Sequence, residues 1–130
     1  MNDRASAPFV SHVGICHIDA SAESACAEVA LGPHLLNRSG SAHGGLIATL
    51  LDTTMSRAAL LACGGDGGVA TLEMKVSYIN PGRGTLRCQA WPAQRDASLV
   101  SLDAEVRDAS GLLVARGSAT FKHRPKPHKP

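Results

Sequence analysis

Residues 34–62 determine the architecture of this chain, and they read HLLNRSGSAHGGLIATLLDTTMSRAALLA. A polar loop opens the segment and leads into the triplet His43-Gly44-Gly45. The residues that follow are mostly apolar, contain no proline and include a single carboxylate, Asp52. This pattern predicts a long central helix that begins at the glycines and ends near Cys63.

The start of this helix could bind a ligand. The first backbone N–H groups of a helix have no partner inside it, and the helix dipole adds partial positive charge there. Glycines allow a ligand to approach the backbone closely. The amides of Gly44, Gly45 and Leu46 could therefore bind an oxygen that carries negative charge. The alternative is a glycine-rich entry into an ordinary core helix.

Asp52 lies on a helix face whose other members are small. The residues that share this face at spacings of three and four are Gly45, Ala48, Asp52, Ser56 and Ala59. A single aspartate in a helix is usually a solvated surface group. Small neighbours would also suit a groove or a contact with another subunit.

His43 and Asp52 cannot form an acid–base pair within one helix. Their separation of nine residues corresponds to about two and a half turns, so they point to opposite sides roughly 13 Å apart along the axis. If both belong to one active site, a second copy of the chain must supply one of them. The spacing then predicts a homodimer with shared active sites.

The ordered motifs of this region resemble a known family. They are Asn37-x-x-Gly40-x-x-His43-Gly44-Gly45, then Asp52, then residues 68–74, GVATLEM. Together they look like the hotdog-fold acyl-CoA thioesterases of the PaaI-like (phenylacetic acid degradation) type, over roughly residues 9–122. The resemblance implies an α+β hotdog fold, in which a twisted antiparallel sheet of about six strands wraps one long helix. It also implies an acyl-CoA substrate, a homotetramer, and no metal or organic cofactor.

The resemblance also implies roles for particular residues. The Gly45 N–H would polarise the thioester carbonyl, and Asp52 of the facing subunit would activate water or attack directly. Asn37 would orient water or substrate, His43 would hold the loop or contact the thioester, and Thr71 would position the water. Each of these three also has an ordinary interpretation: a loop turn for Asn37, a helix-entry hydrogen bond for His43 and a plain strand position for Thr71. The expected substrate contacts are Gly44, Leu46, Ser56, Lys122 and Arg124.

Composition narrows the classes of function. A chain of 130 residues with 44% hydrophobic residues suits one domain with a real core. The formal net charge of +2 and the aromatic content of 3% argue against a nucleic-acid partner. No segment is apolar enough for a membrane span or a signal peptide, so we expect a cytoplasmic protein without a membrane partner. The four cysteines are scattered, which favours free buried thiols, and His12, Cys16 and His17 lack further partners for a metal.

The remaining sequence predicts strands and flexible ends. A loose arm covers residues 1–8, the hotdog domain residues 9–122, and a basic, proline-rich tail residues 123–130. Strands are expected over residues 13–18, 25–31, 71–78, 85–90, 100–107 and 112–122. Turns such as Asn80-Pro81-Gly82 predict that successive late strands pair as antiparallel neighbours. The polar face of the sheet should carry Glu73, Lys75, Arg87, Gln89, Asp103 and Glu105.

We therefore expect an acyl-CoA thioesterase for aryl-acetyl or medium-chain acyl groups. Two alternatives stay open from the sequence. One is a hotdog hydratase or dehydratase that acts on acyl-CoA, and the other is a non-catalytic acyl-CoA-binding protein. The basic tail has two interpretations as well: a disordered end, or a source of cations for the phosphates of the substrate.

Overall fold

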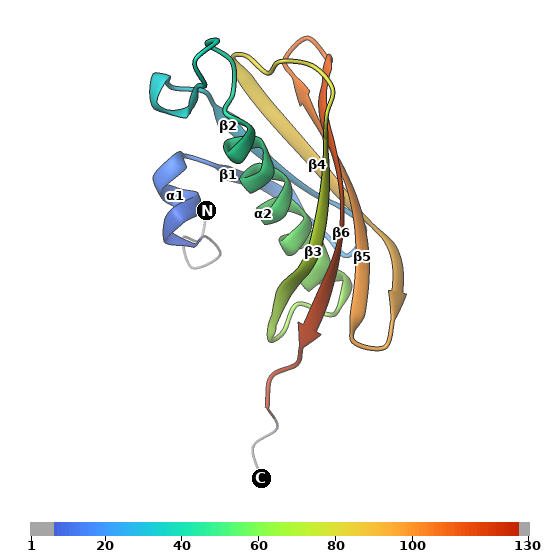
Figure 1. The fold of residues 1–130 in the computed structure, drawn as a ribbon. Helices are drawn as coiled ribbons and strands as arrows, with labels where there is room; N and C mark the ends of the chain where they lie inside the picture. Colours follow the sequence, from blue (N-terminus) through green and yellow to red (C-terminus); the bar gives the residue numbers. More distant parts are fainter. Residues whose placement is uncertain (1–6, 128–130) are drawn as a thin grey trace.

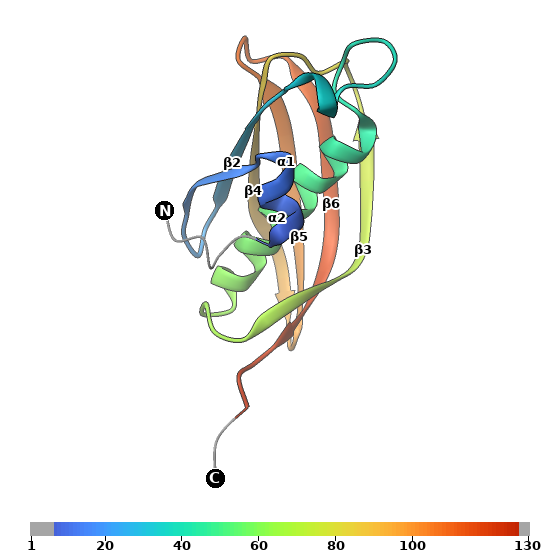
Figure 2. The same ribbon diagram turned by 90° about the vertical axis from the view of Figure 1, so that its left-hand side faces the viewer.

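The computed structural model describes residues 7–127 of the chain. Six strands form one antiparallel sheet in the order β1-β2-β4-β5-β6-β3, as the hotdog resemblance implies. The elements are α1 (Pro8–Val13), β1 (Cys16–Ala20), β2 (Ala25–Ala30), the 3-10 helix η2 (Pro33–Leu35), α2 (Gly44–Ala62), β3 (Gly68–Tyr78), β4 (Thr85–Asp96), β5 (Leu99–Asp108) and β6 (Leu113–Arg124). Figure 1 shows α2 lying along one face of the curved sheet, and Figure 2 shows α1 on the side of α2 that faces away from it.

Helix α2 and the sheet build one core between them. The periodic apolar residues of α2 point at the sheet, and Leu50, Leu51 and Met55 are fully buried. Alternating residues of the strands are buried against the helix, including the fully buried Phe121. At Gly117 of β6, an added Cβ would lie 3.1 Å from Leu51, so this glycine permits the helix to approach the sheet closely.

The prediction that the third and fourth strands pair as a hairpin is wrong. Strands β3 and β4 lie apart in the sheet, because β3 pairs with β6 at its outer edge. After Tyr78 the chain is held by the Val114 carbonyl, which accepts hydrogen bonds from the amides of Ile79 and Asn80. Gly82 then accepts from the amide of Ala42, so the connection crosses toward the loop before α2 instead of turning back.

The predicted boundaries at both ends need correction. A short helix, α1, occupies Pro8–Val13, so Val13 ends a helix and does not begin a strand. Pro8 suits the first turn of that helix, and Gly14 ends it with a φ of 83°. At the other end β6 continues to Arg124, two residues beyond the predicted domain. The rest of the predicted arm and tail, residues 1–6 and 128–130, lies outside the described residues.

The edge strand β3 and the residue after it expose three large apolar side chains among polar ones. Leu72 and Tyr78 are each 56% exposed, and the adjacent Ile79 is 48% exposed. Within residues 7–127 the backbone of β3 pairs on one side alone, with β6. An exposed sheet edge with large apolar side chains invites pairing with another strand.

Two further expectations can be compared with the structure. All four cysteines are free thiols, and Cys26, Cys63 and Cys88 are buried, whereas Cys16 is exposed. None of the helices within the described part of the chain is long and apolar enough to cross a membrane.

Candidate active site

Asp52 has one side-chain hydrogen-bond partner among the described residues, and it is Thr71. The Thr71 hydroxyl donates to Oδ1 of Asp52 over 2.7 Å, from strand β3 to helix α2. Asp52 is half-buried, and Thr71 is exposed on the edge strand. The carboxylate is therefore fixed at one oxygen, and Oδ2 is left without a hydrogen-bond donor from the described part of the chain.

The N-terminus of α2 is organised by His43. His43 is the N-cap residue, and its Nδ1 accepts a hydrogen bond of 2.9 Å from the amide of Gly45. Its carbonyl oxygen accepts from the amide of Leu46, whose side chain lies in the core. A Cβ on Gly45 would lie 3.0 Å from the same ring nitrogen, which explains a glycine at this position. Of the first amides of α2, Gly44 alone has no acceptor among the described residues.

Tyr78 anchors this end of α2 to the edge strand. Its hydroxyl donates to the carbonyl oxygen of Gly44 over 2.9 Å. Strand β3 thus contacts α2 at two points, through Thr71 at Asp52 and through Tyr78 at Gly44. A cavity of about 300 Å³ opens beside the same helix end, between His43 and Gly45 of the helix entry and Phe9 of α1.

Asn37 shapes the loop that precedes the helix. Its Oδ1 accepts from the amides of Ser39 and Ser41, and its Nδ2 donates to the Ser41 hydroxyl. This is the loop-turn arrangement that the sequence left open for Asn37. Only the second hydrogen of Nδ2 stays free to meet a ligand.

The expected site residues form separate groups within one chain. Asn37, His43, Gly44, Gly45 and Leu46 gather at the start of α2. Asp52, Ser56 and Thr71 lie farther along that helix. From Gly44 to Asp52 the axial distance is roughly 12 Å. No single thioester carbonyl can touch both groups in one protomer.

Lys122 and Arg124 lie at the opposite end of the sheet from the helix entry. Arg124 pairs with Gly68 across the β3–β6 ladder, whereas Tyr78 at the other end of β3 contacts Gly44. The two ends of β3 are roughly 33 Å apart. These cations are therefore remote from the Gly44 amide of their own chain.

A second group of polar residues lies close to Asp52, and apart from Ser56 none of its members was assigned to the site from the sequence. A cavity of about 410 Å³ is lined by His17 of β1, by Val69 of β3, and by Thr53, Ser56 and Arg57 of α2, among others. His17 is only 7% exposed, and the Nδ1 of His17 and the Nε of Arg57 are buried without a hydrogen-bond partner in the described residues. Burial, and to a smaller extent the charge of Arg57, lowers the pKa of His17 from its ordinary value.

The sequence offered little to find this pair. His17 drew attention only as a metal ligand, and the described part of the chain contains no cluster of three or more potential ligands. Forty residues separate His17 from Arg57, and the strand order brings them together. An arginine within an otherwise small or apolar helix segment was the one available signal.

Two of the buried thiols, Cys26 and Cys88, are poor candidates for a nucleophile. Burial raises the pKa of the Cys88 thiol to about 12, although a hydrogen bond with Thr54 acts in the opposite direction. Burial also raises the pKa of Cys26. A thiol that stays protonated at neutral pH reacts poorly. The Asp52 carboxylate is therefore the stronger candidate for the reacting group.

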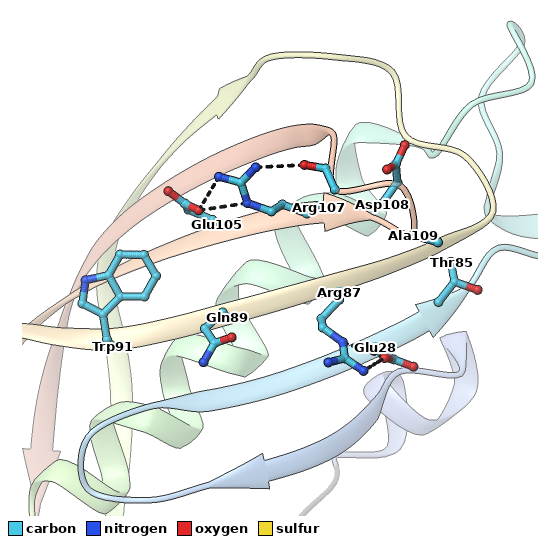
Figure 3. A pocket seen from close by; sticks show the side chains of 10 residues that line it. Glu28, Thr85, Arg87, Gln89, Trp91, Glu105, Arg107, Asp108 and Ala109 are labelled. Atoms are coloured by element: carbon cyan, nitrogen blue, oxygen red, sulfur yellow. Dashed lines mark hydrogen bonds and ion pairs between the residues drawn. The ribbon is translucent and has the colours of Figure 1, made fainter.

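Another cavity lies on the other side of the sheet. Figure 3 shows this groove of about 540 Å³ on the face turned away from α2. Four of its charged residues form pairs, Arg87 with Glu28 and Arg107 with Glu105. None of the residues expected in the active site lines it. This polar face matches the one predicted from the alternating strands.

Comparisons with known proteins show which family the chain resembles. The family model described as "Thioesterase superfamily" matches residues 39–115, which include the helix entry, Asp52 and Thr71. Acyl-coenzyme A thioesterase THEM4 of Xenopus laevis is 44% identical over 50 residues, which are 38% of this chain and 21% of that protein. The chain spans 21% and 60% of the lengths of the two curated relatives that it matches.

Solved structures resemble the whole domain. The conserved protein PA5202 of Pseudomonas aeruginosa superimposes with a TM-score of 0.89 at 31% identity, over 94% of this chain and 98% of that one. The PaaI protein of the E. coli phenylacetic acid degradation operon superimposes with a TM-score of 0.82, over 93% of this chain and 87% of that one. At 19% identity, PaaI supports the fold alone.

A curved antiparallel sheet around one helix, with an aspartate on that helix facing the edge strand, defines a protein of the hotdog class. The chain belongs to the thioesterase superfamily.

Proposed function

We propose that this protein hydrolyses acyl-CoA thioesters to a free acid and CoA. The observation that supports this most is the half-buried Asp52, held at one oxygen by Thr71 and open at the other. Hydrolysis needs a carboxylate of this kind, an electrophilic carbonyl and a donor for the negative charge that develops on it. The donor is an amide at the start of α2.

The two halves of the site come from two protomers. If two β3 strands pair antiparallel about a two-fold axis near Met74 and Lys75, the Thr71 end of one strand lies beside the Tyr78 end of the other. Thr71 contacts Asp52, and Tyr78 contacts Gly44. This pairing therefore brings Asp52 toward the partner's Gly44. The exposed apolar edge of β3 supports such a dimer.

The oxyanion donor in this arrangement is the amide of Gly44. The Gly45 amide already donates to His43, so it becomes available only if the His43 ring turns away. Loss of one such donor typically lowers kcat by about a hundredfold to a thousandfold. Asn37 supports the donor from a distance, because it fixes the loop that leads to His43.

The reaction has two routes that use the same carboxylate. As a general base, Asp52 takes a proton from water, the resulting hydroxide adds to the carbonyl, and the CoA thiolate leaves and is protonated. As a nucleophile, Asp52 itself displaces the thiolate to give a mixed anhydride, which water then hydrolyses. Thr71 positions the carboxylate in both routes, and Ser56 lies one turn farther along the helix on the acyl side.

The CoA portion extends toward basic residues. Lys122 and Arg124 are exposed near the Gly68 end of β3. In the antiparallel dimer that end lies toward the partner's loop before α2, so both cations come close to this end of the shared site from the outer face of the sheet. Phosphate groups bind arginine and lysine through charge-assisted hydrogen bonds. A tetramer formed from two such dimers remains a prediction.

A panel of acyl-CoA thioesters with detection of the released thiol tests this function. We expect thiol release from phenylacetyl-CoA or from medium-chain acyl-CoA, and release that depends on Asp52. Water addition to crotonyl-CoA without thiol release would favour a hydratase. Binding of every thioester without any reaction would favour an acyl-CoA-binding protein. Either result would contradict the proposal.

A further inference from the structure

The cavity beside Asp52 continues the proposed active site along α2. Ser56, which lines it, lies one helical turn beyond Asp52. Val69, which also lines it, lies two residues before Thr71 and so faces the same side of β3. Asp52 and Thr71 do not line the cavity themselves, but their sequence neighbours Thr53 and Val69 do, so it lies close to the pair on the side that leads away from the start of α2.

Two polar side chains that line this cavity each have a buried nitrogen without a hydrogen-bond partner in the described residues. The Nδ1 of His17 and the Nε of Arg57 are both buried, and neither has a hydrogen-bond partner among residues 7–127. The ion pairs of the same residues do not include Arg57. A buried donor without a partner loses its hydrogen bonds to water and gains nothing in return. A bound ligand that accepts hydrogen bonds from these groups would remove this cost.

The chemistry of the pair selects an anion. Arg57 keeps its positive charge, and an arginine is well suited to bind a carboxylate. Burial and the nearby Arg57 lower the pKa of His17, which favours a neutral ring that can donate one hydrogen bond. Two donors and one positive charge at the end of a cavity match the two oxygens of a carboxylate.

We propose that this cavity binds the far end of the acyl group and that His17 and Arg57 select acyl groups ending in a carboxylate. The inference rests on the proposed function, because it assumes that the thioester carbonyl lies at Asp52. From Asp52 to Arg57 the helix rises by roughly 7.5 Å and turns by about 140°, so the acyl chain runs partly around the helix as well as along it. An acyl chain of about six carbons or more covers that path, so the substrate class is the CoA monothioester of a dicarboxylic acid of about adipate length or longer.

The test compares thioesters of equal chain length. Adipoyl-CoA and hexanoyl-CoA differ at the far end of the acyl group, where one has a carboxylate and the other a methyl group. We expect kcat/KM of the natural chain to be at least about tenfold higher for adipoyl-CoA. In Arg57→Met the preference for adipoyl-CoA over hexanoyl-CoA disappears or reverses. Arg57→Lys, which keeps the charge, retains part of the preference.

A matched control separates this effect from a general loss of positive charge. Arg116 is exposed on β6, on the face of the sheet turned away from α2, and Arg116→Met should leave the preference intact. Circular dichroism confirms that each variant is folded. Equal rates for the two thioesters, or a preference that survives Arg57→Met, would overturn the proposal. So would a preference for 4-hydroxyphenylacetyl-CoA over phenylacetyl-CoA that matches the adipoyl preference, since a hydroxyl would then suffice.

Binding measurements keep this result independent of hydrolysis. The thioether analogue of adipoyl-CoA, in which a methylene replaces the carbonyl, cannot react. Calorimetry should show it binding the natural chain at least about tenfold more tightly than the hexanoyl analogue, with the difference lost in Arg57→Met. If the thioesters release no thiol but the two analogues still differ in affinity, the thioesterase function is rejected and the carboxylate site is still supported. Equal binding of the two analogues would reject the site itself.

Discussion

Thr71 donates its hydroxyl hydrogen to Oδ1 of Asp52 over 2.7 Å, and this bond joins the edge strand to the central helix. The two residues are 19 positions apart in the sequence. Because the hydroxyl hydrogen points at the carboxylate, the lone pairs of the Thr71 oxygen are free to accept a hydrogen bond from water. The pair can therefore hold a water molecule between a hydroxyl oxygen and the open Oδ2 of Asp52.

Replacement of Asp52 by asparagine should abolish most of the hydrolysis. The change keeps the shape of the side chain and its hydrogen bond with Thr71, but it removes the base or nucleophile. We expect kcat to fall by about a hundredfold to ten-thousandfold, measured as thiol release from the best acyl-CoA of the panel. Asp103→Asn, on the polar face of the sheet, is the control and should leave kcat unchanged. Turnover retained in Asp52→Asn would reject the assignment.

The Thr71 hydroxyl should matter for turnover more than for stability. Thr71→Val keeps the branched shape on an exposed strand and removes the donor to Asp52. We expect kcat to drop by roughly tenfold, as for a hydrogen bond to a charged group, while the melting temperature stays nearly constant. Thr71→Ser restores the hydroxyl and should restore most of the rate. Equal rates for the valine and serine variants would show that the bond is incidental.

Gly44→Pro isolates the oxyanion donor. Proline has no N–H and is favoured in the first turn of a helix, where that N–H has no helical partner. The preceding residue, His43, has φ −60° and ψ 136°, which is the conformation that a following proline requires. The variant should therefore fold normally and lose about a hundredfold to a thousandfold in kcat. Gly44→Ala keeps the amide, and an added Cβ would make only ordinary contact with Tyr78 at 3.5 Å, so its loss should be much smaller.

His17 should make stability depend on pH. Burial, with a smaller contribution from Arg57, lowers the pKa of His17 in the folded state. The unfolded chain therefore binds more protons than the folded one at pH values below the ordinary pKa of 6.5, and the protein is destabilised as the pH falls below that value. We expect the melting temperature to be flat above about pH 7.5 and to fall between about pH 6.5 and pH 5.

The His17→Gln variant removes this titration. Its melting temperature should therefore vary less with pH between about pH 6.5 and pH 5 than that of the natural chain. His12 is exposed on α1, and His12→Gln serves as the matched control, with the pH dependence of the natural chain. Identical curves for His17→Gln and the natural chain would show that other groups cause the acid sensitivity.

The sequence predicted the elements of the fold better than their arrangement. Period-two alternation identified the late strands, and the uninterrupted apolar segment identified α2, because both patterns are local. Strand order depends on contacts that alternation does not encode. Strand β3 pairs with β6 along its length, the Val114 carbonyl accepts bonds from Ile79 and Asn80 just beyond it, and no turn motif revealed this pairing.

Some features of the candidate site were also predictable from the sequence, and others depend on the tertiary structure. Asp52 and Thr71 were singled out by motif, and the structure brings them into contact. The hydrogen bond from the Gly45 amide to His43 depends on the orientation of one ring, which shifts the free donor to Gly44. The closeness of His17 and Arg57 arises only when β1 packs beside α2. Local patterns do not report a contact across that sequence distance.

The central claim is that one protomer supplies Asp52 and its partner supplies the amide at the start of α2. Mixed dimers test it directly. The Asp52→Asn and Gly44→Pro variants are each nearly inactive, but a dimer with one of each contains one intact site and one site with both defects. Refolding the two variants together in equal amounts should restore roughly a quarter of the natural activity, because about half of the dimers are mixed. A mixture that forms hybrid dimers, as seen by native mass spectrometry, yet stays as inactive as its parents would contradict the shared site.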